Sequence, residues 1–136
     1  MKPKKLFMMC SLLFLVLLGA CSKDLNTKVK MNSKWILTSW PGNSLPANGS
    51  ATLNISDANK IGGKSFCNTY GGTAVFNGNA IQFSQLISTK MYCTELAAAE
   101  DKYLADLQSV NAGSLAGNKL TLMKDGKVLL IFSRAE

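Results

Sequence analysis

Short stretches of alternating apolar and polar residues, or of mostly apolar residues, recur along the chain from residue 34 onward. Alternation with a period of two is typical of a half-buried strand, and short apolar runs between turns are typical of a buried one. These stretches cover residues 34–37, 51–55, 61–66, 73–83, 120–122 and 128–132. The polar segments between them contain turn residues such as Pro41-Gly42 and Asp57-Ala58-Asn59. The pattern predicts short strands joined by turns.

Two of the turns carry strong hairpin signals. Asn77-Gly78 divides the stretch 73–83 into two apolar-rich runs, and Asp125-Gly126 joins residues 120–122 to 128–132. Both turn positions of such pairs favour positive φ, which matches the twist of a two-residue hairpin. The last stretch is apolar enough for a central position in a sheet.

One segment shows helical spacing instead. Thr94 is placed to cap a helix of about residues 95–110, and Glu95 falls in its first turn. Apolar residues recur at intervals of three and four, at Leu96, Ala99, Tyr103, Leu107 and Val110. We therefore expect an α+β fold, a single compact domain in which about seven or eight short antiparallel strands pack with one main helix.

The N-terminal segment has a different composition. Lys2, Lys4 and Lys5 form a basic start, and residues 6–18 are apolar apart from single small residues. That run is shorter than the roughly 20 residues that a membrane-spanning helix needs. A basic start, a short apolar run and small residues after it are typical of a secretory signal peptide.

The end of this segment, Leu18-Gly19-Ala20-Cys21, resembles the lipobox of bacterial lipoproteins. The resemblance implies cleavage before Cys21, diacylglycerol on its thiol, and acylation of the new N-terminus by a fatty acid such as palmitate. Several acyl chains on one residue give lasting membrane anchorage. The alternative is an ordinary signal peptide with a cysteine after its cleavage site by chance. We expect a signal peptide over residues 1–20, a flexible lipidated tether over 21–33 and one domain over 34–134.

The charge of the mature chain is lower than that of the full sequence. The full chain carries 15 Lys+Arg and 8 Asp+Glu, and losing three lysines with the signal peptide leaves 12, so the net charge falls from +7 to +4. Lys23, Lys28, Lys30 and Lys34 lie near the proposed lipid, where they either contact anionic headgroups or belong to a solvated tether. The remaining lysines are scattered, so no nucleic-acid partner is expected. We expect a monomer.

Ser22 bears on the final location of the protein. It follows Cys21 where an aspartate would favour retention in the inner membrane of enteric bacteria. The sequence therefore favours a lipid-anchored protein of the cell envelope, located at the outer membrane. It does not indicate whether the domain faces the periplasm or the cell surface.

Two cysteines remain for the mature domain, Cys67 and Cys93. Pairs of thiols in an oxidising compartment tend to form disulfides, although two packed free thiols are the alternative. The chain contains no histidine and no CxxC pair, so neither a zinc site nor an activated cysteine or serine nucleophile is favoured. We expect a disulfide, no bound metal and no cofactor.

Several short motifs together resemble the META domain, the family that includes HslJ. The motifs are Trp35-x-Leu37, Cys67-Asn68-x-Tyr70-x-Gly72, Thr89-x-Met91-x-Cys93, Glu100-x-x-Tyr103-x-x-x-Leu107 and Asp125-Gly126-Lys127. The resemblance covers residues 34–133. It departs from the family at Phe66, where glycine is usual, and at Tyr92, where alanine is common. Both changes add aromatic bulk beside the cysteines.

The resemblance implies an envelope lipoprotein, in some members associated with heat shock or antibiotic tolerance, and no established enzymatic activity or cofactor. We therefore predict a protein that is not an enzyme, is linked to envelope stress or antibiotic tolerance, and binds another envelope protein. An inhibitor of an exogenous hydrolase such as lysozyme or a protease is the alternative. A hydrolase is the third hypothesis and would depend on acidic residues such as Glu100 and Asp101.

A disulfide between Cys67 and Cys93 would bring Asn68, Tyr70, Thr89 and Tyr92 together as a binding surface for a peptide or glycan, with Met91 beside them. The competing interpretation gives these residues structural roles. Asn68 would tolerate a strained turn, Thr89 would bond a backbone group and Met91 would fill core space. The acidic residues Glu95, Glu100, Asp101 and Asp106 are expected on a solvated helix face.

Overall fold

The computed structural model describes residues 25, 29, 32–56 and 59–136. The expected signal peptide and the expected lipidation site at Cys21 lie outside the described residues. No helix among the residues that the structure describes combines the length and the apolar character needed to cross a membrane.

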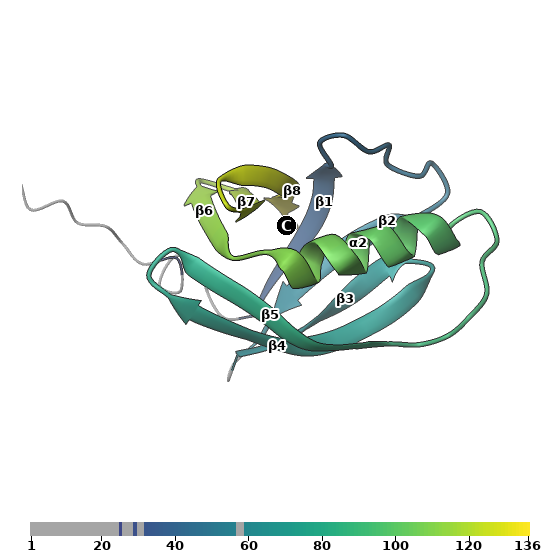
Figure 1. The fold of residues 1–136 in the computed structure, drawn as a ribbon, viewed down its shortest axis with the longest axis horizontal. Helices are drawn as coiled ribbons and strands as arrows, with labels where there is room; N and C mark the ends of the chain where they lie inside the picture. The colour runs from purple at the N-terminus through teal and green to yellow at the C-terminus, as the bar shows by residue number, and fades with distance from the viewer. Residues whose placement is uncertain (1–24, 26–28, 30–31, 57–58) are drawn as a thin grey trace, which may run out of the picture.

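Eight antiparallel strands follow one another in chain order and close into a barrel, with β8 pairing back to β1 (Figure 1). The strands are β1 (Ser33–Ser39), β2 (Ser50–Ile55), β3 (Lys60–Phe66), β4 (Asn68–Asn77), β5 (Ala80–Ser88), β6 (Ala112–Ala116), β7 (Lys119–Lys124) and β8 (Lys127–Arg134). The main helix, α2 (Ala97–Ser109), lies between β5 and β6 in the chain. The α+β class, the number of strands and the single main helix are as predicted.

Alternating side chains of the strands fill the barrel. In β1 Trp35 and Leu37 are buried, whereas Lys34, Ile36 and Thr38 are exposed. The same alternation on the other strands supplies the rest of the core, which includes Leu53, Ile81, Phe83, Leu120, Leu122, Leu130 and Phe132. The interior is therefore packed with large apolar side chains.

The two predicted hairpins form, one of them displaced by a residue. Asp125 and Gly126 both take positive φ, 48° and 80°, between the paired ends of β7 and β8, as expected for a two-residue turn. In the other hairpin Asn77 pairs with Ala80, so the turn residues are Gly78 and Asn79 instead of Asn77 and Gly78.

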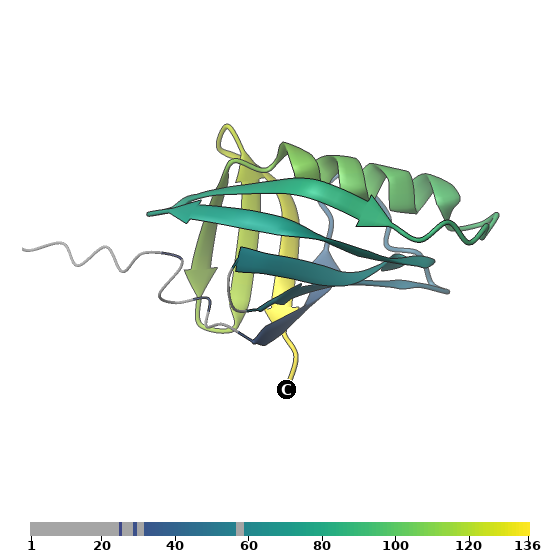
Figure 2. The same cartoon turned by 90° about the horizontal axis from the view of Figure 1, so that it is seen from below.

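The shortest pairing between neighbouring strands of the barrel is that between β5 and β6. These strands pair at a single position, Ala80 with Ala112. Helix α2 packs alongside β5 and makes further contacts with β3 and β8 (Figure 2). The helix thus covers the part of β5 that lacks a second strand among the described residues.

The helix begins later than the sequence indicates, and Thr94 does not cap it. The N-cap is Leu96, without a side-chain hydrogen bond, because the backbone N–H groups of Leu96 and Ala97 both donate to the carbonyl of Cys93. The predicted apolar face is present. Tyr103, Leu107 and Val110 are buried, while Leu96 and Ala99 are partly buried against the core.

Two residues of the expected tether belong to the core. Leu25 and Val29, which we call the N-terminal latch, are 1% and 2% exposed. The N–H of Leu25 donates to the carbonyl of Gly78 at 3.2 Å, and the N–H of Val29 donates to that of Leu25 at 2.8 Å. Burial of such side chains contributes about 1.5–3 kcal/mol each. The expected flexible tether over residues 21–33 is therefore corrected at the latch, and at Ser33, which starts β1.

Candidate functional site

The residues around the cysteines begin with a tight connection between β3 and β4. Ser65 pairs with Asn68, so the chain reverses within two residues, and Phe66 takes φ 70°. This left-handed conformation strains residues other than glycine, which the family resemblance expects at this position. The Phe66 ring stacks on Trp40 with centroids 5.7 Å apart, which holds the strained residue in place. The strain lies at Phe66, so the interpretation that Asn68 occupies a strained turn is wrong.

Asn68 is the centre of a buried hydrogen-bond network. Its amide nitrogen donates to the carbonyl of Met91 at 3.0 Å and to the Glu100 carboxylate at 2.9 Å. Its amide oxygen accepts from the N–H of Met91 at 2.7 Å and from the Thr89 hydroxyl at 2.9 Å. All four hydrogen-bonding positions of the side chain are used. One residue therefore joins β4, the loop after β5 and the helix.

Glu100 lies in the first turn of α2 and is only 6% exposed. The prediction that it belongs to a solvated helix face is therefore wrong. Its carboxylate accepts from the Ser65 hydroxyl at 2.7 Å and from Asn68 at 2.9 Å. A negative charge is also favoured near a helix N-terminus by the helix dipole. These partners explain why a carboxylate is tolerated inside the protein.

Asp106 is a second acidic residue whose predicted exposure is wrong; it is 8% exposed. It accepts a hydrogen bond from the Trp40 indole nitrogen at 2.9 Å and forms an ion pair with Lys102 one helical turn earlier. Glu95 and Asp101 are exposed, as predicted. The helix thus uses two of its three carboxylates, Glu100 and Asp106, to attach itself to the barrel.

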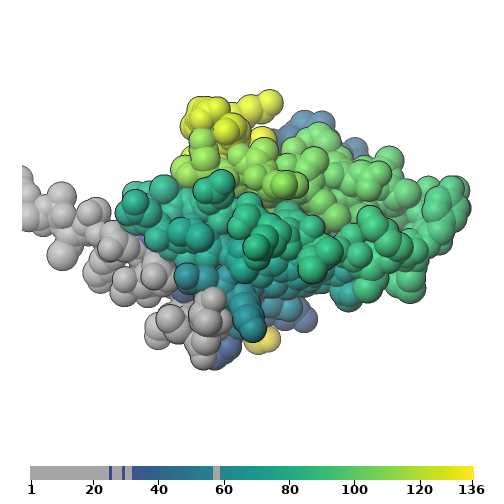
Figure 3. All heavy atoms as spheres, turned by 60° about the horizontal axis from the view of Figure 1, so that its bottom comes forward, coloured from purple at the N-terminus to yellow at the C-terminus, as the bar shows by residue number. Residues whose placement is uncertain are grey.

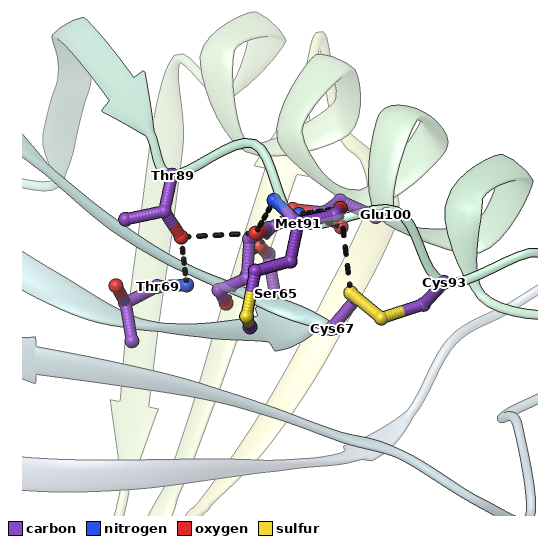
Figure 4. The surroundings of a disulfide bond; sticks show 8 residues. Ser65, Cys67, Thr69, Thr89, Met91, Cys93 and Glu100 are labelled. Carbon is purple, nitrogen blue, oxygen red and sulfur yellow. Dashed lines mark hydrogen bonds between the residues drawn. A yellow bond between two sulfur atoms is a disulfide. The ribbon is translucent and has the colours of Figure 1, made fainter.

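Cys67 and Cys93 form a disulfide in the structure, with Cα atoms 6.0 Å apart (Figure 4). It links the β3–β4 connection to the loop that leads into α2. Figure 4 shows Thr89 and Met91 on the same loop, where the Thr89 hydroxyl and the Met91 backbone bond to the network beside the disulfide. The loop is thus fixed at Cys93 by a covalent bond and at Thr89 and Met91 by the Asn68 side chain.

Tyr70 does not belong to an exposed binding surface, contrary to the prediction. It is 5% exposed, and its hydroxyl lies 2.9 Å from that of Tyr103 and donates to the carbonyl of Thr52 at 2.9 Å. Burial raises the pKa of the Tyr70 phenol far above its ordinary value. Burial likewise raises the pKa of Tyr103, and the neighbouring Tyr70 raises it further. The two phenols attach the helix to the barrel wall.

The remaining predicted residues are at the surface. Tyr92 is 83% exposed and Met91 63% exposed, so the interpretation of Met91 as a core residue is wrong. Thr89 is exposed, and its hydroxyl oxygen accepts from the N–H of Thr69, which agrees with a structural role.

The structure adds Ile87 to the exposed apolar residues near the loop; it is 76% exposed and was not among the predicted site residues. The adjacent apolar residues Leu86 and Ile87 break the period of two, and this signal could have identified it. The break coincides with an irregularity at Gln85, which takes φ 54°. We call Ile87, Met91 and Tyr92 the loop surface.

A groove between β5 and α2 adjoins the loop surface. One hollow of about 200 Å³ is lined by Thr89, Met91 and Tyr92, and the largely buried Asn68 and Glu100 lie at its floor. A second hollow of about 350 Å³ continues beside Ile87 and Leu104. Figure 3 shows the face formed by β5 and α2, with the loop that precedes α2 at the right end. An apolar loop beside a shallow groove is suited to binding a protein surface or a peptide.

Another hollow, of about 510 Å³, lies near the β4–β5 turn and the end of α2. Its lining is mostly apolar and amide side chains with one charged residue, Lys124. Within the described part of the chain, no group of three or more acidic or cysteine side chains could hold a metal ion. These hollows supply no convergent set of reactive groups among the described residues.

The comparisons with known proteins agree with the motifs. The model of the META domain matches residues 26–136. No curated protein matches the sequence significantly.

Solved structures share the fold. An NMR structure of a protein from Burkholderia xenovorans has a TM-score of 0.69 at 23% identity and covers 79% of this chain and 85% of its own. A second NMR structure has a TM-score of 0.63 at 18% identity, with 80% and 94% covered. A crystal structure of a DUF4847 family protein from Bacteroides vulgatus has a TM-score of 0.59 at 14% identity, with 78% and 94% covered.

Proposed function

The chain belongs to the META domain family, and from this premise we propose that it is a lipid-anchored protein of the bacterial cell envelope that binds another envelope protein through the loop surface and catalyses no reaction. The proposal includes a location at the outer membrane and a role in envelope stress or antibiotic tolerance.

The observation that carries the proposal is the loop surface itself. Ile87, Met91 and Tyr92 are 76%, 63% and 83% exposed, although each would gain free energy by burial. The loop that holds Met91 and Tyr92 is fixed by the disulfide and by Asn68. A preorganised loop loses little conformational entropy on binding, and tyrosine and methionine are enriched at protein interfaces.

The bonding of the carboxylates supports a binding role over hydrolysis. Glu100 is held by Ser65 and Asn68, and Asp106 by Trp40 and Lys102. Within the described residues, each of these carboxylates is thus engaged by donors of the barrel or the helix, whereas glycosidases work with two carboxylates that face each other across a cleft. In this proposal both serve to attach the helix.

The anchor and the cellular role have separate support. The anchor rests on the sequence Leu18-Gly19-Ala20-Cys21, and the outer-membrane location rests on Ser22. The link to stress or antibiotic tolerance rests on the resemblance to the META domain family.

Crosslinking in cells tests the binding proposal. A photoreactive residue replaces Tyr92 in the full lipidated chain, and a matched variant carries it at Val75, which is 59% exposed on β4. We expect one dominant captured protein at position 92 and none at position 75. The purified partner should then bind the Tyr92→Ala variant at least about tenfold more weakly, the effect of losing a central interface residue.

Other outcomes separate the alternatives. A diffuse set of abundant envelope proteins at both positions would contradict a dedicated partner. Capture of a lysozyme or a protease, followed by saturable one-to-one inhibition in a purified assay, would establish the inhibitor alternative instead.

A further inference from the structure

The N-terminal latch determines how far the domain can stand from its lipid. Leu25 is four residues after Cys21, and four residues span at most about 14 Å when fully extended. A free tether from Cys21 to the start of β1 at Ser33 has 12 residues and would reach about 42 Å. Burial of Leu25 therefore removes about two thirds of the reach.

The latch has a defined seat on the barrel. The N–H of Leu25 bonds the carbonyl of Gly78 in the β4–β5 turn. Its side chain lies against Gly113 so closely that a Cβ added to this glycine would be 2.9 Å from Leu25 Cδ2. Gly113 of β6 thus leaves room for the leucine, and Leu25, four residues after Cys21, is held at the β4–β5 turn.

The loop surface is at the other end of the same hairpin. β4 has 10 residues, and strands rise about 3.3 Å per residue, so the Asn68 end is about 30 Å from the Asn77 end. The β4–β5 turn and the loop leading into α2 accordingly lie at opposite ends of the molecule (Figure 1).

We propose that the latch holds the β4–β5 turn end of the barrel against the bilayer and presents the loop surface at the far end, away from the membrane. This rests on the proposed lipidation of Cys21. A domain held this close to the bilayer cannot move far from the membrane on a long tether. Its partner must therefore reach the loop surface from the aqueous side.

Moving an insertion from one side of the latch to the other tests this directly. About ten Gly/Ser residues, adding roughly 18 Å of root-mean-square reach, are inserted either after Ser22 or after Met31 in the acylated protein. The two chains have identical composition. Only the first insertion lies between the lipid and the latch.

The readout is energy transfer from a dye to acceptor-labelled lipids in vesicles that contain the acylated protein. The dye is attached at Asn79→Cys in the β4–β5 turn or at Ala98→Cys in the first turn of α2; both positions are exposed. In the parent protein we expect more transfer from position 79 than from position 98. The insertion after Ser22 should abolish this difference, and the insertion after Met31 should preserve it.

The latch proposal is overturned if both insertions have the same effect or if the parent shows equal transfer from both dyes. Mass spectrometry of the purified protein tests the lipidation separately. A chain without acyl groups would refute the lipoprotein proposal alone, and the latch would then be judged by amide exchange. A Val29 N–H that exchanges as fast as an exposed amide would refute the latch.

Discussion

At the scale of single residues, the side chain of Asn68 joins β4 to a loop and a helix whose bonded residues lie 21 to 32 positions later in the sequence. It bonds Thr89 and Met91 on the loop before α2 and Glu100 within the helix. Aspartate would place a second negative charge against Glu100, and leucine would leave all four partners unsatisfied. The position therefore requires an amide, which has two donors and two acceptors.

Replacing Asn68 with alanine should lower the free energy of unfolding by about 3 kcal/mol, because the buried Glu100 carboxylate loses one of its two donors and the Met91 N–H loses its acceptor. Urea denaturation of the oxidised protein measures the loss. Asn54→Ala, at an exposed position of β2, is the matched control and should change the value by less than about 0.5 kcal/mol. Equal losses for the two variants would contradict the role given to Asn68.

The sequence predicts some of these residues well and others poorly. The disulfide was predictable because only two cysteines remain once Cys10 and Cys21 are assigned to the N-terminal segment. The burial of Glu100 was not, because its partners Ser65 and Asn68 lie 35 and 32 residues away and nothing in the local pattern announces them. Polar residues buried by long-range bonds look like surface residues in a sequence.

At the scale of elements, local sequence signals predicted an element correctly where its geometry depends only on residues close in sequence. The Asp125-Gly126 turn forms as predicted because both residues accept positive φ. The prediction of a cap at Thr94 is wrong because the backbone N–H groups at the start of the helix donate to the carbonyl of Cys93. The position of that carbonyl depends on the disulfide and on Asn68. The latch was missed because Leu25 and Val29 are isolated apolar residues in a polar segment.

The disulfide should contribute about 3.5 kcal/mol to stability, since it closes a loop with a sequence separation of 26. The double variant Cys67→Ser, Cys93→Ser should lose about that amount in urea denaturation without a reductant. Adding a reductant to the parent should reproduce the loss, and the double variant should not respond to it. An unchanged midpoint in both would show that the hydrogen bonds of the loop are sufficient by themselves.

At the scale of the whole molecule, closure of the sheet into a barrel could not be read from the strand pattern. Alternation shows that each strand has one buried face, but the pairing of β8 with β1 depends on the twist and stagger of all eight strands. The tyrosine pair at the centre is likewise a product of the complete fold. Tyr70 comes from β4 and Tyr103 from α2.

This pair makes the stability of the whole domain sensitive to alkaline pH. Both phenols have a pKa raised in the folded state above the ordinary value of about 10, so the unfolded chain loses these protons first. Their contribution is complete below about pH 10 and is lost as the pH rises, by up to about 1.4 kcal/mol per pH unit for each tyrosine.

Urea denaturation at about pH 9 and about pH 11 measures the loss, with Tyr70→Phe, Tyr103→Phe as the matched variant. The parent should lose more stability over this interval than the variant, in which only the other titrating groups contribute. Should the double variant fail to fold, Tyr70→Phe alone should show part of the difference. Parallel pH dependence of parent and variant would contradict the assignment.

The single pairing between β5 and β6 has a consequence for the newly synthesised chain. Until α2 is in place, residues 81–88 of β5 have one edge hydrogen-bonded to β4 and the other free of any strand of the described chain. An open edge of this kind pairs readily with a strand from another molecule. The disulfide fixes the start of the helix beside that edge, so early oxidation protects the chain from strand exchange and aggregation while it is still folding. A delay in oxidation would leave that edge open for longer, so that more chains pair with strands of other molecules before the helix covers it.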